Sequence, residues 1–142
     1  MTVLRETLDV AKPLEEVFAF VGDFANSERW DPGVASAKKV GDGPIAIGTR
    51  YDLDVRFNER VLPMTYTVTA WDPPRRVVLE GRGPTVNATD EITFEAIPTG
   101  TRIRYMADLR LKGPLRILEP LMRRRFQQVA DDAMAGMRSA LA

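Results

Sequence analysis

The chain has 142 residues, and its 20 Lys and Arg residues balance 20 Asp and Glu residues, so its formal net charge at pH 7 is zero. Because there is no broad positive field, nucleic-acid binding is disfavoured. The sequence has no cysteine and no histidine, which excludes disulfides, thiolate zinc sites and catalysis of the Ser-His-Asp or Cys-His type. Carboxylates are the only strong metal ligands left, and none are clustered at metal-binding spacing, so no metal is expected.

The first ten residues mix Arg5, Glu6 and Asp9 with apolar residues, so they lack the apolar core of a signal peptide. No apolar run elsewhere reaches the length of a membrane span. We therefore expect a cytoplasmic protein without an integral membrane segment. The length is typical of one domain, so residues 1–142 are expected to fold around a single core.

A strand is predicted over residues 4–10, where apolar and polar residues alternate. Pro13 is suited to the first turn of a helix that ends at Gly22. Residues 23–30 are predicted to form a second short helix or turn, which the Asp31-Pro32-Gly33 turn closes. Two short helices are therefore expected directly after the first strand.

Six further strand-like segments follow, and turn-forming residues separate them. Short connections of this kind favour antiparallel neighbours. Pro63 removes a backbone donor, so an edge position or a bulge is expected there. The segments cover residues 34–40, 49–57, 61–71, 76–81, 87–97 and 101–111.

A long helix is predicted from the Gly113-Pro114 pair onward, because apolar residues recur at spacings of three and four. About 28 helical residues would make a rod about 40 Å long. Pro120 falls in the first two turns, so a start nearer Glu119 is the alternative. The apolar stripe consists of Leu118, Met122, Phe126, Val129, Ala133 and Met137. The order of elements predicts an α+β fold, with a seven-stranded curved antiparallel sheet around this C-terminal helix.

The predicted sheet is too wide for one helix to cover. Seven strands span roughly 30 Å, whereas a helix with its side chains is about 10–12 Å across. The sheet is therefore expected to curl around the helix and to leave an internal gap. We expect a pocket of roughly several hundred Å³ between helix and sheet.

Several tracts of the sequence resemble the START-like, or helix-grip, superfamily, which includes Bet v 1-type proteins and the polyketide cyclase/dehydrase group of SRPBCC proteins. The resemblance covers nearly the whole chain. It rests on the order of elements and on four tracts: Pro13-Leu14-Glu15-Glu16-Val17-Phe18, Trp30-Asp31-Pro32-Gly33-Val34, Gly48-Thr49-Arg50-Tyr51 and Trp71-Asp72-Pro73-Pro74-Arg75-Arg76. It implies a deep apolar cavity for lipids, steroids or polyketides, and no common metal or cofactor.

Two polar groups are candidates for catalysis, Glu6 and Tyr105. Glu6 continues the inward alternation of its strand, so burial could raise its pKa, although a Glu at the cavity mouth is the alternative. Tyr51, Tyr66 and Tyr105 lie on the apolar faces of their strands, where each phenol either contacts a ligand or is a satisfied core group. Trp30 is expected either to wall the pocket or to pack the two short helices together.

The predicted apolar lining comes from the inner face of the sheet and from one face of the helix. By contrast, the Arg123-Arg124-Arg125 run lies off the apolar stripe and is expected to face water rather than to bind phosphate. The lining residues are Leu53, Val55, Met64, Val68, Phe94, Tyr105, Leu109, Met122, Phe126 and Val129.

The sequence therefore predicts a domain that binds a hydrophobic small molecule of lipid-like or polyketide-like character. One alternative is an enzyme of the polyketide cyclase or dehydratase type that uses cavity Tyr and Glu groups. A second alternative is a protein-binding module of the Hsp90 co-chaperone type, which would need a large apolar patch on the outer sheet face. The sequence specifies neither the ligand nor an oligomeric state.

Overall fold

A computed structural model describes residues 1–142. Seven strands form one antiparallel sheet in the order β1-β7-β6-β5-β4-β3-β2. This arrangement confirms the predicted α+β helix-grip fold, with two short helices after the first strand and one long helix at the end. The strands are β1 (Thr2–Val10), β2 (Val34–Lys39), β3 (Arg50–Phe57), β4 (Arg60–Asp72), β5 (Arg76–Arg82), β6 (Val86–Ile97) and β7 (Gly100–Leu111).

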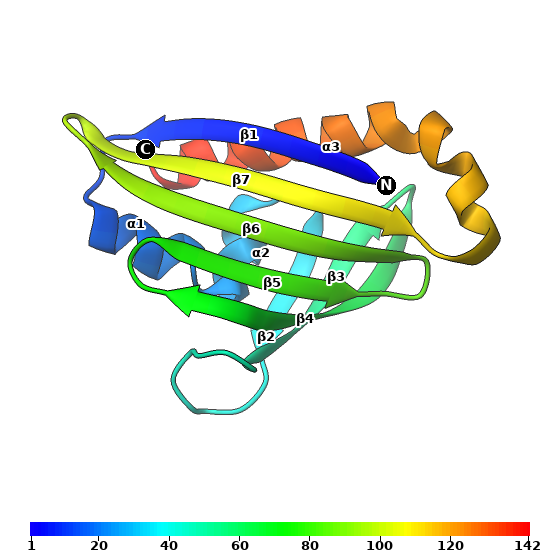
Figure 1. Ribbon diagram of the computed structural model, residues 1–142, viewed down its shortest axis with the longest axis horizontal. Coiled ribbons are helices and arrows are strands. Elements are labelled where there is room, and N and C mark those ends of the chain that lie inside the picture. Colours follow the sequence, from blue (N-terminus) through cyan, green and yellow to red (C-terminus); the bar gives the residue numbers. More distant parts are fainter.

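Helices join the two free edges of the sheet. The first helix is α1 (Leu14–Val21), followed by the 3₁₀ turn η1 (Phe24–Asn26) and α2 (Ser27–Trp30). The C-terminal helix α3 (Glu119–Ala140) runs along β1 at one edge, and α2 connects α3 to β2 at the other edge. The curved sheet is thus closed across its concave side (Figure 1). No helix of the protein combines the length and apolar character that a membrane crossing requires.

The long helix begins at Glu119, as the alternative reading of the sequence suggested. The preceding residues form the 3₁₀ helix η2 (Gly113–Leu118), so the predicted helical stretch consists of two different parts. Pro120 falls in the first turn of α3, where its missing N–H leaves no hydrogen bond unmade.

Pro63 has the edge position that the sequence predicted, although only locally, and no bulge lies there. Strand β4 lies inside the sheet, between β3 and β5. Pro63 pairs with Asp54 of β3, whereas the ladder between β4 and β5 begins only at Thr65, and the irregularity in that ladder lies between Val68 and Ala70. The proline is tolerated because it lies beyond the end of the β5 ladder, where no partner strand needs its backbone donor.

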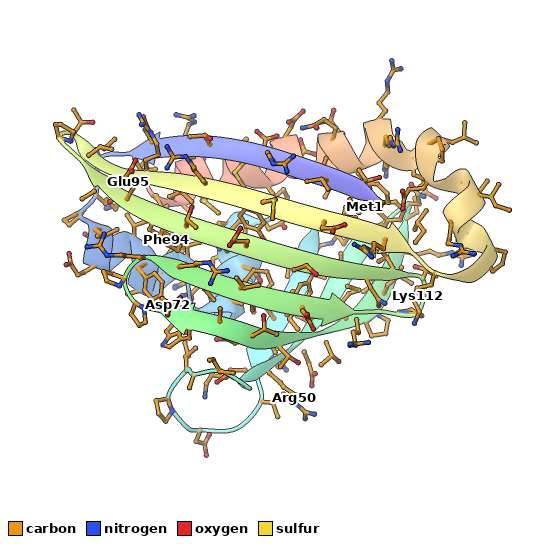
Figure 2. All side chains as sticks on the ribbon, in the orientation of Figure 1. Met1, Arg50, Asp72, Phe94, Glu95 and Lys112 are labelled. Carbon is orange, nitrogen blue, oxygen red and sulfur yellow. The ribbon has the colours of Figure 1, made fainter.

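The core is filled at one end of the concave sheet, where α1 packs. Phe18 of α1 contacts Phe94 and Trp71, with ring centroids 5.1 and 5.0 Å apart respectively. Polar and charged side chains project from the outer face of the sheet (Figure 2), where ion pairs such as Arg102–Asp9 (2.8 Å) join neighbouring strands. The empty space of the molecule lies at the other end of the concave face.

Candidate functional site

A cavity of about 170 Å³ lies between α3 and the concave face of the sheet, and 21 of its 26 lining residues are hydrophobic. It is smaller than the pocket of several hundred Å³ expected from the sequence. The reason is that bulky aromatic side chains from η1, α2, β4 and β7 occupy part of the gap: Phe24, Trp30, Tyr66 and Tyr105.

Most of the side chains predicted to line the pocket do lie on the cavity wall. The strands contribute inward-facing residues at alternating positions, and α3 contributes one face, as its apolar periodicity indicated. The predicted residues on the wall are Glu6, Trp30, Leu53, Val55, Met64, Tyr66, Tyr105, Leu109, Phe126 and Val129.

Four predicted lining residues, Tyr51, Val68, Phe94 and Met122, are not on the wall. Tyr51, Val68 and Phe94 face inward but are buried in the filled part of the core. The rings of α1 and η1 cover this part of the sheet, so its inner face is packed rather than open. Met122 lies one turn before Phe126, in the first turn of α3.

The polar groups most deeply placed in the cavity include two that the sequence analysis missed, Asp90 and Asp31. Asp90 belongs to the inner face of β6, because it continues the alternation of Ala88, Ile92 and Phe94. That alternation was a signal in the sequence for an inward carboxylate, but only Glu6 of β1 was predicted to be one. Asp31 was taken only as a turn former.

Asp90 and Tyr105 form a hydrogen-bonded pair inside the cavity. The Tyr105 hydroxyl donates to Oδ2 of Asp90 from the neighbouring strand β7. Burial raises the pKa of Asp90 to about 7, the hydrogen bond from Tyr105 opposes this shift, and the charge of Asp31 adds to it. A carboxyl group that titrates near neutral pH can exchange protons under physiological conditions.

Asp31 lies at the end of α2 and combines a structural contact with a place on the cavity wall. Its Oδ1 accepts a hydrogen bond of 2.8 Å from the Gly33 backbone N–H, which fixes the turn into β2. Burial raises the pKa of Asp31 to about 6, against the lowering effect of the Gly33 hydrogen bond, and the charge of Asp132 on α3 raises it further. The cavity therefore holds two carboxyl groups whose charged forms are poorly solvated.

Glu6 lies directly opposite Tyr105 in the pairing of β1 and β7. Its carboxylate Oε1, however, accepts a 2.8 Å hydrogen bond from Gln127 Nε2 on α3, in an exposed position. The Tyr105 hydroxyl is bonded to Asp90 instead. The structure thus gives Glu6 the rim position of the alternative reading, and its predicted catalytic partnership with Tyr105 stays a prediction.

Aromatic rings form a continuous wall on the side of the cavity where the carboxyl groups lie. The Trp30 and Tyr105 rings meet edge to face at 6.1 Å, and Phe24 contacts Tyr66 at 5.0 Å and Trp30 at 6.4 Å. Trp30 therefore both walls the cavity and packs against η1. The Tyr66 ring lies flat over Gly81 of β5, where an added Cβ would come within 2.6 Å of two ring carbons.

Basic side chains are nearly absent from the cavity. Arg56 is the one Lys or Arg among the lining residues, and its Nη1 donates to the Pro32 carbonyl oxygen at 2.9 Å.

Arg123, Arg124 and Arg125 are exposed on α3, as the helical stripe predicted. No group of three or more Asp and Glu side chains is placed to hold a metal ion.

Comparisons with known proteins agree on the fold. The family model for polyketide cyclase / dehydrase and lipid transport proteins matches residues 1–142. No curated protein matches the sequence.

Among solved structures, the protein TTHA0849 from Thermus thermophilus is 17% identical, with 98% of this chain and 96% of that chain covered and a TM-score of 0.82. A START superfamily protein from Mycobacterium smegmatis is 14% identical, with 99% and 97% covered and a TM-score of 0.81. The ZhuI aromatase/cyclase from Streptomyces sp. R1128 is 14% identical, with 98% and 92% covered and a TM-score of 0.77.

Proposed function

Because the chain belongs to the family of polyketide cyclase / dehydrase and lipid transport proteins, we propose that it binds an apolar small molecule in the cavity between α3 and the sheet. The observation that carries this proposal is the cavity itself, with its predominantly hydrophobic wall. Protein interiors are normally packed to high density, so an apolar space of this size is costly to maintain without a use.

The size of the cavity limits the ligand. A cavity of about 150 Å³ is sufficient for a benzene-sized molecule, and the cavity here measures about 170 Å³. The ligand, or the part of a lipid-like or polyketide-like ligand that enters, is therefore a single ring or a short chain. A longer ligand would have to extend out of the cavity into solvent.

Filling the cavity is expected to abolish binding. Ala130 lies on the cavity wall, whereas Ala135 lies on an exposed part of the same helix. We expect Ala130→Leu to weaken the binding of 2-phenylethanol, measured by calorimetry, by about ten-fold or more, because the added side chain occupies ligand space. Ala135→Leu makes the same change outside the cavity and should bind as wild type does. Equal binding by both variants would show that the probe does not enter this cavity.

A second candidate function is acid–base catalysis of the cyclase or dehydratase type, and the Asp90–Tyr105 pair favours it. If the chain is such an enzyme, we expect Asp90→Asn to lower turnover of a polyketide-like substrate by about 10²–10⁴-fold with little change in affinity. Glu6→Gln should keep most of the activity, because Glu6 lies at the rim. A collapse of turnover in Glu6→Gln instead would assign the proton transfer to Glu6, and a wild type without turnover would favour a carrier.

The protein-binding alternative finds little support in the outer surface. The outer face of the sheet carries ion pairs such as Arg76–Glu91 (2.8 Å) and Arg104–Glu95 (3.4 Å). The large apolar side chains that are exposed lie at strand ends, in the loop before β3 and around the start of α3. The large apolar patch that this alternative requires is therefore missing from that face.

A further inference from the structure

We propose that the cavity selects ligands that carry a protonated amine, so that the apolar part of the ligand fills the cavity while its ammonium group lies between Asp31, Asp90 and the surrounding aromatic rings. This inference rests on the proposed binding function and goes beyond it by naming the charge of the ligand.

The charged side chains on the cavity wall are mostly acidic. The lining residues include three carboxylates, Glu6, Asp31 and Asp90, but only one basic side chain, Arg56. The guanidinium of Arg56 is exposed and is held by backbone carbonyl oxygens at 2.9 and 3.5 Å. The buried negative groups of the cavity therefore have no cationic partner in the protein, although buried charges are normally paired.

Asp31 and Asp90 line the same cavity. Asp31 directly follows Trp30 in the chain, and the Trp30 ring lies 6.1 Å from the ring of Tyr105, which is hydrogen-bonded to Asp90. The charge of Asp31 adds to the raised pKa of Asp90, after the larger effects of burial and of the Tyr105 hydrogen bond. The hydrogen bonds they receive come from neutral donors, the Tyr105 hydroxyl and the Gly33 N–H. An ammonium placed between them would supply the missing positive charge, whereas a ligand carboxylate would be repelled.

The aromatic side chains of the cavity wall independently favour a cationic ligand. Phe24, Trp30, Tyr66 and Tyr105 all line the cavity. Phe24 contacts both Tyr66 and Trp30, and Trp30 also contacts Tyr105. Aromatic faces attract organic cations, and cages of such rings are a common way to recognise ammonium groups. Neutral and anionic ligands gain no comparable attraction from these rings.

The Tyr66 hydroxyl supports the same assignment. Tyr66 is only 8% exposed, and burial raises the pKa of its phenol, with further contributions from the charges of Asp90 and Asp31. No hydrogen bond satisfies this hydroxyl in the protein, unlike that of Tyr105. As a phenol on the cavity wall, Tyr66 has an oxygen that can accept a hydrogen bond from a ligand N–H group.

The test compares three probes that share one ring and differ in charge: 2-phenylethylamine, 2-phenylethanol and phenylacetate. Calorimetry at about pH 8 is suitable, because the pKa values of Asp31 and Asp90 are about 6 and about 7 and an aliphatic amine is still protonated there. We expect the amine to bind about ten-fold or more tightly than the alcohol, and phenylacetate to bind most weakly.

Variants then identify the groups responsible. Asp90→Asn and Asp31→Asn keep the shape of the side chain and remove its charge, so each should reduce the ratio of amine to alcohol affinity by about five-fold or more. The alcohol measured on the same variant reports whether its cavity is intact. Asp52→Asn removes a carboxylate that is exposed on β3, and it should leave the ratio unchanged.

Each outcome is decisive. Alcohol binding without a preference for the amine, or a preference that survives in both cavity variants, would overturn the inference and leave the proposed function standing. If none of the three probes binds to the wild type, the proposed function fails and the inference fails with it.

Discussion

Gly136→Ala is expected to destabilise the protein by about 3 kcal/mol or more, although alanine is the better helix former. Gly136 lies in α3 at its contact with α2, where a Cβ would lie 1.9 Å from the Trp30 carbonyl oxygen and 3.1 Å from its carbonyl carbon. Both are backbone atoms, so no side-chain rotation can relieve the clash. The helix α3 or the end of α2 would have to move.

The control for this change is another glycine. Gly43 has no neighbouring atom within 4 Å of an added Cβ, so Gly43→Ala should change the free energy of unfolding by less than about 0.5 kcal/mol. Urea denaturation measures the free energy of unfolding of both variants, and the comparison holds if the m-value is unchanged. Because helix propensity alone would stabilise Gly136→Ala by about 1 kcal/mol, a variant as stable as wild type would contradict the close packing of α2 on α3.

The second large effect concerns Asp90 and pH. Its pKa is raised from 3.8 to about 7 in the folded protein, so the folded state binds more protons than the unfolded state between these values. The contribution of this group to stability is therefore complete below about pH 4 and is lost as the pH rises through about 7. Asp31 contributes in the same direction up to about pH 6.

Asp90→Asn is accordingly expected to stabilise the protein at about pH 8 by roughly 2–4 kcal/mol and to leave its stability nearly unchanged at about pH 4. Asparagine retains an oxygen that can accept the Tyr105 hydrogen bond but carries no charge. Urea denaturation at both pH values measures the free energy of unfolding. Asp52→Asn, which removes an exposed carboxylate, is the reference variant, so the difference between the two variants gives the effect of the buried charge of Asp90. Lower stability of Asp90→Asn at about pH 8 would show that the ionised carboxylate is stabilising in its pair with Tyr105.

The order and type of the elements could be predicted because alternation, turn residues and helical spacing are local properties of the chain. The strand predicted over 61–71, for example, is β4 (Arg60–Asp72). The edge position at Pro63 was predictable from its missing N–H, but the place of β4 inside the sheet was not, because it depends on how the strands pair.

The cavity wall was predictable only in part, since facing inward is a local property and facing an empty space is not. Phe94 and Leu53 both face inward, yet Phe94 packs against Phe18 of α1 at 5.1 Å while Leu53 borders the cavity. Asp90 had a sequence signal in its position two residues before Ile92. The hydrogen bond that it accepts from Tyr105 was not predictable, because it depends on the pairing of β6 with β7.

Native mass spectrometry of the protein purified from its own host is the most direct test of small-molecule binding in the cavity. It detects a bound molecule without the choice of a probe. We expect a wild-type complex that is heavier than the bare chain by the mass of one small organic molecule. This added mass should be lost in Ala130→Leu and retained in Ala135→Leu. A wild type found only as the bare chain, or a bound mass that persists in Ala130→Leu, would contradict binding in this cavity.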